Sequence, residues 1–101
     1  MHKILGIFVS SDQHLDKIVK LSRAAKEKGV EVQIFFTHIG TRLCMDPRVK
    51  ELKALATVAL CKVGFESYDL NKDDALIDEK AFLSQSCHAE MIYHCDRYLT
   101  F

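Results

Sequence analysis

The chain has 101 residues, 49% of them hydrophobic, and its 14 basic and 14 acidic residues give a formal net charge of zero. This length suits one hydrophobic core, so we expect a single domain over residues 1–101. The balanced charge argues against binding to nucleic acid or to anionic membranes, both of which need a positive field. The apolar content leads us to expect another subunit over part of the surface.

No apolar run in the sequence approaches the roughly 20 residues that a membrane-spanning helix needs. The apolar start of the chain is short, and the polar residues 10–14 interrupt it, which does not fit a secretory signal. We therefore expect a cytoplasmic protein whose cysteines are reduced. These cysteines are Cys44, Cys61, Cys87 and Cys95.

The first third of the chain predicts a strand, a helix and a second strand. Residues 3–10 are almost unbroken apolar sequence, as in a strand buried on both faces. Residues 30–36 predict a second strand, which the right-handed crossover rule makes parallel to the first. Between them lies an amphipathic helix that ends at Gly29, a residue suited to the left-handed C′ position. Its inward positions are Leu15, Ile18, Val19, Ser22 and Ala25.

The middle of the chain has weaker patterns. Residues 37–45 are expected to form a loop or a short helix. Asp46 and Pro47 then make a favourable N-cap and N1 pair for a second helix. The run 54–62 contains a short buried strand that ends at Cys61, and the chain is expected to turn directly after it.

The C-terminal part predicts several short elements. Met91 and Ile92 are expected to pack inward from the last of its helices. All the patterns together predict an α/β protein with a mostly parallel sheet of about five strands, covered by helices on both faces. The short elements are a helix or turn at 63–69, a helix at 72–78, a strand at 81–83, a helix at 87–95 and a final strand at 96–101.

Cys61 is the leading candidate for chemistry, because it ends the predicted third strand. In open α/β sheets the carboxyl ends of parallel strands face the functional crevice. A thiol there can act as a nucleophile, and the neighbouring Lys62 would favour its thiolate form. The alternative is that Cys61 only packs, since free cysteine is among the most buried residue types. Cys44 and Cys95 are expected to be packing residues.

Other polar side chains follow the other predicted strands and should reach the same edge of the sheet. Ser10 and Ser11 follow the first strand, Thr37 and His38 follow the second, and Cys87 follows the fourth. His38 can donate or accept a proton there. Each has a structural alternative, because Ser11, like the neighbouring Asp12, can cap the first helix, His38 can bind a backbone group and Cys87 can fill a gap.

Neither a metal nor a cofactor is expected. The sequence has no glycine-rich dinucleotide or phosphate-binding motif and no C-x-x-C pair. The pairs Cys87–His94 and His88–Cys95 are each seven residues apart. Seven residues of helix span roughly 10 Å, which is too far for both members of a pair to bind one zinc ion directly.

Five segments carry a family resemblance: Ile4–Ser10, the long first helix, Val32–Gly40 with its Phe-Phe-Thr-x-x-Gly element, Val58–Glu66 and Asp96–Phe101. Together they resemble the DsrE/DsrF-like family, which includes sulfur-relay subunits related to TusD and proteins labelled predicted peroxiredoxins. The resemblance implies a DsrEFH-like three-layer α/β/α sandwich with five strands, assembled as trimers or hexamers. It also implies that Cys61 corresponds to the cysteine that carries a persulfide in the sulfur-relay members.

The sequence thus leads to a DsrE-like sulfur carrier or sulfurtransferase that acts through Cys61, with sulfur donor and acceptor proteins as partners. Two alternatives stay open. One is a non-catalytic oligomeric module that binds a small ligand and uses its cysteines only for packing. The other is a thiol redox sensor that pairs Cys61 with Cys87 or Cys44, which requires two sulfur atoms within disulfide reach.

Overall fold

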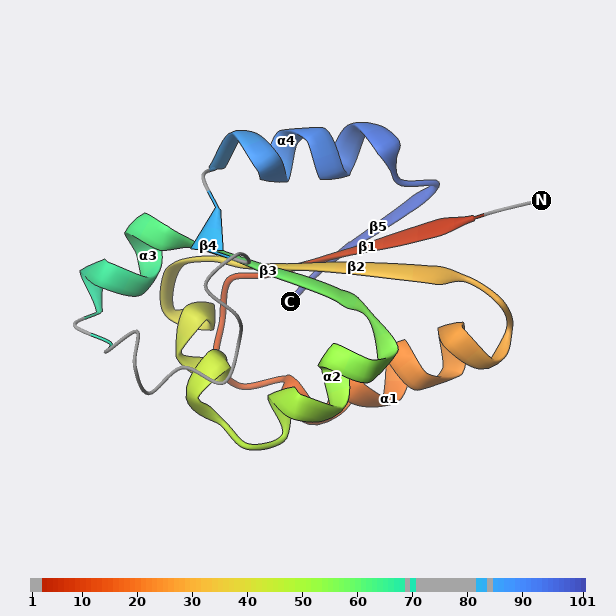
Figure 1. The fold of residues 1–101 in the computed structure, drawn as a ribbon, viewed down its shortest axis with the longest axis horizontal. Helices are drawn as coiled ribbons and strands as arrows, with labels where there is room; N and C mark the ends of the chain where they lie inside the picture. Colours follow the sequence, from red (N-terminus) through yellow and green to blue (C-terminus); the bar gives the residue numbers. More distant parts are fainter. Residues whose placement is uncertain (1–2, 69, 71–81, 84) are drawn as a thin grey trace.

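A computed structural model describes residues 3–68, 70, 82–83 and 85–101 (Figure 1). Its strands form one sheet in the order β4-β3-β2-β1-β5, and every neighbouring pair is parallel. The two-residue β4 only extends the β3 edge of a sheet whose other strands have four to six residues. The predicted parallel α/β sheet is confirmed. The strands are β1 (Ile4–Val9), β2 (Glu31–Phe36), β3 (Thr57–Cys61), β4 (Phe82–Leu83) and β5 (Arg97–Thr100).

Helices cover both faces of the sheet, and the order of the strands explains their placement. From β1 to β3 the chain advances across the sheet in one direction, whereas from β4 to β5 it returns to the opposite edge. Right-handed crossovers therefore place α1 and α2 on one face and α4 on the other, as Figure 1 shows. No helix among the described residues is long and apolar enough to cross a membrane. The helices are α1 (Leu15–Glu27), the 3-10 helix η1 (His38–Met45), α2 (Val49–Leu55), α3 (Lys62–Ser67) and α4 (Gln85–His94).

The main hydrophobic core lies between the sheet and the α1/α2 layer. Inward strand residues such as Ile7, Ile34 and Leu60 are fully buried there against α1, η1 and α2. The predicted inward face of α1 is confirmed, since four of its five positions are buried and Ala25 packs partly buried. Gly29 has a φ of 77°, as its predicted C′ position requires.

The predicted caps of the first two helices are wrong. His14 is the N-cap of α1 and makes no side-chain capping bond, and Asp12 instead lies 3.6 Å from the guanidinium of Arg42. The N-cap of α2 is Arg48 rather than Asp46. The carboxylate of Asp46 accepts the backbone N–H of Arg48 at 2.9 Å and also pairs with its guanidinium, so it stabilises a turn before the helix.

Most of the short C-terminal elements match their predictions. The strand predicted at 81–83 is β4, the helix at 87–95 is α4, the final strand is β5, and the helix or turn after Cys61 is α3. The helix predicted at 72–78 lies outside the described residues. Ile92 was expected to pack inward, but it is 42% exposed, whereas its neighbour Met91 is half-buried. The position of α4 over the sheet determines which side of this helix is covered.

Candidate functional site

Cys61 occupies the junction between β3 and α3, where it is both the last strand residue and the N-cap of the helix. Its Sγ accepts a hydrogen bond from the backbone N–H of Gly64 at 3.4 Å. The residue is only 2% exposed. It nevertheless borders a hollow of about 580 Å³, here called the Cys61 hollow. Cys61 therefore borders a partly open hollow at the carboxyl end of the sheet, although the residue itself has little exposed surface.

The Cys61 hollow brings together two segments that are distant in the sequence. Thr37 and His38 lie directly after β2, and the rest lie between the end of β3 and the residue after α3. Among the predicted site residues, Thr37, His38 and Cys61 thus meet at one edge of the sheet. The complete described lining is Thr37, His38, Cys61, Val63, Gly64, Ser67 and Tyr68.

A tight turn after β2 positions His38 at this hollow. Thr37 donates its backbone N–H to the carbonyl of Val9 at 2.9 Å, and Gly40 donates to the carbonyl of Thr37 at 2.9 Å. His38 is exposed and has a φ of 50°, in the left-handed region, and Thr41 Oγ1 fixes its carbonyl with a 2.8 Å hydrogen bond. A Cβ at Gly40 would collide with the Val9 carbonyl oxygen, so the glycine is required for this turn to pack on β1.

A second glycine brings α3 against the same turn. A Cβ at Gly64 would lie 3.1 Å from the backbone nitrogen of His38 and 3.5 Å from Thr41 Cγ2. The absence of a side chain therefore lets the first turn of α3 approach η1 closely. Phe65 is buried and packs edge-to-face on Phe82 with ring centroids 5.0 Å apart, which fixes α3 to β4.

Three further predicted site residues, Ser10, Ser11 and Lys62, do not line the Cys61 hollow. Ser10 donates its backbone N–H and its hydroxyl to the carbonyl of Phe101, at 2.8 and 3.2 Å, and so joins the ends of β1 and β5. Ser11 has a buried hydroxyl without a hydrogen-bond partner among the described residues, and it does not cap α1. Lys62 is exposed and points outside this lining. The side chain of Cys87 lies outside the described part of the structure.

The other described cysteines differ from Cys61 in their surroundings. Cys44, Cys61 and Cys95 are all free thiols. Burial raises the pKa of Cys44 to about 12, so this thiol stays protonated within the core. The pKa of Cys95 is also raised, mainly by burial and then by the carboxylates of Asp96 and Glu31. Within the described residues, no group of three or more His, Cys, Asp or Glu side chains could hold a metal ion.

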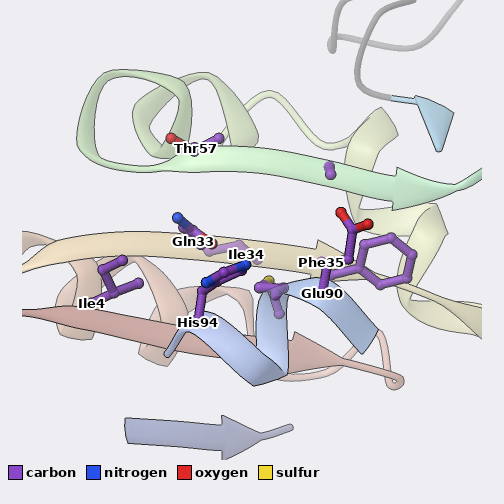
Figure 2. Close-up of a pocket in the computed structure, with 9 residues that line it drawn as sticks. Ile4, Gln33, Ile34, Phe35, Thr57, Glu90 and His94 are labelled. Atoms are coloured by element: carbon purple, nitrogen blue, oxygen red, sulfur yellow. The ribbon is translucent and has the colours of Figure 1, made fainter. Parts of the chain in front are cut away.

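A second hollow, of about 460 Å³, lies between α4 and the sheet and is here called the α4 hollow (Figure 2). None of Gln33, Thr57 and Glu90 was predicted as a site residue, and His94 was considered only as a zinc ligand. A local signal exists in the polar positions 33 and 57 within otherwise apolar strands. The described lining of the α4 hollow is Ile4, Gln33, Ile34, Phe35, Thr57, Ala59, Glu90, Met91 and His94.

The class defined by these observations is an α/β protein with a parallel sheet and a cysteine-lined hollow at the carboxyl edge of its strands. Comparison with known proteins adds no closer assignment, because no family model matches the chain and no curated protein is significantly similar to it. The resemblance to the DsrE/DsrF-like family therefore rests on the short sequence segments described above.

Proposed function

We propose that this chain is a DsrE-like sulfur carrier or sulfurtransferase that holds a persulfide on Cys61. The observation that supports this most is the position of Sγ, which ends a parallel strand, accepts the Gly64 N–H and borders the Cys61 hollow. Ligands of open α/β sheets bind at this edge. A volume of about 580 Å³ leaves room for one added sulfur atom and for part of a donor molecule.

The proposed reaction has two exchange steps. In the first, the Cys61 thiolate attacks the outer sulfur of a donor persulfide, R–S–SH. A new S–S bond forms, the S–S bond of the donor breaks, and the donor leaves as the thiolate R–S⁻, which gives Cys61–S–SH. In the second, an acceptor thiolate attacks the outer sulfur, the acceptor becomes a persulfide and Cys61 returns as a thiolate. No net oxidation or reduction accompanies either step.

The surroundings of Cys61 suit both steps. The N–H of Gly64 points at Sγ and would stabilise negative charge on it. His38, at the border of the same hollow, can exchange a proton with an incoming or departing thiol. Since Cys61 is 2% exposed, the donor must present its sulfur through the hollow, which would protect the persulfide from other thiols.

Partner proteins fit the surface beside the hollow. Val63 is 69% exposed and Tyr68 is also exposed, and both border the Cys61 hollow. Exposed apolar side chains of this kind are common at protein contact sites. The proposal therefore includes sulfur donor and acceptor proteins that dock here. Because of the family resemblance, we also propose that the chain forms a cytoplasmic homo-oligomer, either a trimer or a hexamer. Native mass spectrometry would measure the mass of this assembly.

The low exposure of Cys61 favours one competing function, a non-catalytic module in which the hollow binds a small ligand and the thiol only packs. The redox-sensor alternative has less support where it pairs Cys61 with Cys44, because Cys44 does not line the Cys61 hollow and burial raises the pKa of its thiol, which disfavours the reactive thiolate. Its pairing of Cys61 with Cys87 stays a prediction, since the Cys87 side chain lies outside the described part of the structure.

Intact-protein mass spectrometry after incubation with a low-molecular-weight persulfide tests the proposal. We expect the wild-type chain to gain the mass of one sulfur atom and the Cys61→Ser variant to gain none. Cys95→Ser is the matched control and should gain the sulfur as wild type does. Addition of a small acceptor thiol should then remove the sulfur and return the original mass.

Two results would overturn the carrier function. If the folded wild-type chain takes up no sulfur, the ligand-binding module becomes the better description of the Cys61 hollow. If Cys61→Ser still gains sulfur, another thiol accepts it, and the Cys87→Ser variant identifies whether that thiol is Cys87.

A further inference from the structure

The α4 hollow is a second candidate site, independent of the proposed sulfur chemistry. Among the described residues, it shares no lining side chain with the Cys61 hollow. It lies on the face of the sheet that α4 covers, away from the carboxyl edge, and is formed by strands β1, β2 and β3 together with α4 (Figure 2). Its volume of about 460 Å³ is in the usual range for small-molecule sites.

The orientation of α4 is unusual for a helix that only packs on a sheet. Such a helix normally buries its large apolar residues and exposes its charged ones. Here Ile92 and Tyr93 are 42% and 84% exposed. Glu90 and His94, four residues apart on one helical face, are also exposed to solvent but border the hollow, and Figure 2 shows them extending from α4 toward the sheet. Polar groups thus converge on this space from the helix.

The sheet contributes further polar groups among an apolar floor. Gln33 and Thr57 pair in register on adjacent strands, and both line the hollow. Gln33 donates its side-chain amide to the carboxylate of Glu31 at 2.7 Å, which leaves its carbonyl oxygen to accept from a ligand. Phe35, Ile4 and Ala59 supply apolar contact surface around these groups.

The charge of the described lining selects the kind of ligand. It contains the carboxylate of Glu90, the imidazole of His94 and no lysine or arginine, and a second carboxylate, Glu31, accepts a hydrogen bond from the Gln33 amide. Anions are therefore disfavoured, whereas a group that is positively charged and rich in donors would find acceptors on both walls. We infer that the α4 hollow binds a small organic cation, a primary amine with an apolar body of about the size of a phenyl ring.

The first experiment compares two probes of similar shape and opposite charge. Phenethylamine and phenylacetate are titrated separately into the full chain, and binding is followed by nuclear magnetic resonance. We expect the amine to shift the Met91 methyl and the Gln33 side-chain amide, with a Kd on the order of 1 mM for a ligand of this size. Phenylacetate should bind at least about tenfold more weakly, because the carboxylate of Glu90 repels it.

Variants then assign the recognition to named groups. Glu90→Gln keeps the shape of an exposed side chain and should weaken amine binding by about tenfold, since a charged hydrogen bond is lost. Glu27→Gln removes an exposed acid at the end of α1, outside the lining, and should leave binding unchanged. Ala59→Leu fills the floor of the hollow and should abolish binding. The signals of the α1/α2 core should keep their wild-type positions, which shows that the variant is folded.

The inference fails if the two probes bind equally or if Glu90→Gln binds the amine as well as wild type does. It also fails if the Met91 and Gln33 signals shift with protein concentration in the absence of a probe, because a second copy of the chain would then occupy the hollow. None of these results affects the proposed function, because sulfur uptake on Cys61 is measured separately.

Discussion

The two faces of the sheet are covered to very different extents. On one face α1, α2 and η1 bury strand residues such as Ile7, Ile34 and Phe36 almost completely. On the other face the ten-residue α4 is the only described helix (Figure 1). A hollow of about 460 Å³ remains beneath it. The path of the chain causes this difference, because the crossovers through α1 and α2 fall on one face and the returning crossover through α4 falls on the other.

The side chains follow the same division. Along β2, Val32, Ile34 and Phe36 enter the core, whereas Gln33 faces the α4 hollow from the same strand. Part of the α4 face is also packed, because the ring of Phe8 in β1 stacks on Phe35 in β2 and on Tyr98 in β5, each with ring centroids 6.3 Å apart. We therefore expect the α1/α2 face to account for most of the stability and the α4 face to have space for a ligand.

The difference between the two faces should have its largest effect on the free energy of unfolding when a matched pair of isoleucines in β1, one on each face, is substituted. Ile7 is fully buried in the α1/α2 core, and Ile7→Ala should lower the free energy of unfolding by roughly 2–5 kcal/mol, because it removes buried surface and leaves a cavity. Ile4 is only half-buried and already borders the α4 hollow, so Ile4→Ala should cost about 1 kcal/mol. Urea denaturation measures both.

The dependence of the unfolding free energy on urea concentration should be the same for the wild-type chain and both variants. The shifts of their unfolding midpoints then report changes in stability alone. Equal losses for Ile7→Ala and Ile4→Ala would mean that the two faces are packed alike. The space beneath α4 would then be closed in solution, and the proposed amine site would have no room.

A smaller effect tests how α4 is attached to the sheet. A Cβ at Gly6 would collide with Cys95 Sγ and lie 3.4 Å from Cys95 Cβ, so Gly6→Ala should displace the end of α4 and cost about 1–3 kcal/mol. Cys95→Ala removes the colliding sulfur. In that background we expect Gly6→Ala to cost much less, and a double-mutant cycle gives the coupling between the two positions. Additive losses would show that α4 does not approach Gly6.

Much of the fold follows from local sequence pattern. The buried face of α1 and the left-handed Gly29 were predictable because helical periodicity and glycine conformation are properties of a short segment. The meeting of Thr37, His38 and Cys61 was predictable because the carboxyl ends of parallel strands share one edge. These predictions needed only the direction of the strands.

The errors concern features that depend on distant parts of the chain. Ser11 has the right chemistry for an N-cap, but the path from β1 places His14 at that position. Ile92 is apolar, yet it faces outward because the route of α4 over the sheet sets which side of the helix is covered. Glu90 gave no signal as a site residue and His94 was considered only as a zinc ligand, since the α4 hollow exists only once three strands and a returning helix are assembled.

The smallest expected effect is a change in the pH dependence of stability. It is tested by comparing the buried thiol of Cys44 in the α1/α2 core with the more exposed thiol of Cys95 on the α4 face. Burial in the α1/α2 core raises the pKa of Cys44 from its ordinary 9.0 to about 12. Below pH 9 the thiol is protonated in both the folded and the unfolded chain, so its contribution to stability is fully present. Between pH 9 and about 12 only the unfolded chain ionises readily, so stability should fall by about 1.4 kcal/mol for each pH unit.

Urea denaturation at pH 8 and pH 10 measures this loss as the difference between the wild-type chain and Cys44→Ala, which cancels the titration of the other groups. We expect Cys44→Ala to lose less stability over this interval, by about 1 kcal/mol. Cys95→Ala is the matched control on the α4 face, where partial exposure weakens the linkage, and it should follow wild type more closely. If Cys44→Ala loses as much stability as wild type, water reaches Cys44, and the α1/α2 core is not the tightly packed face.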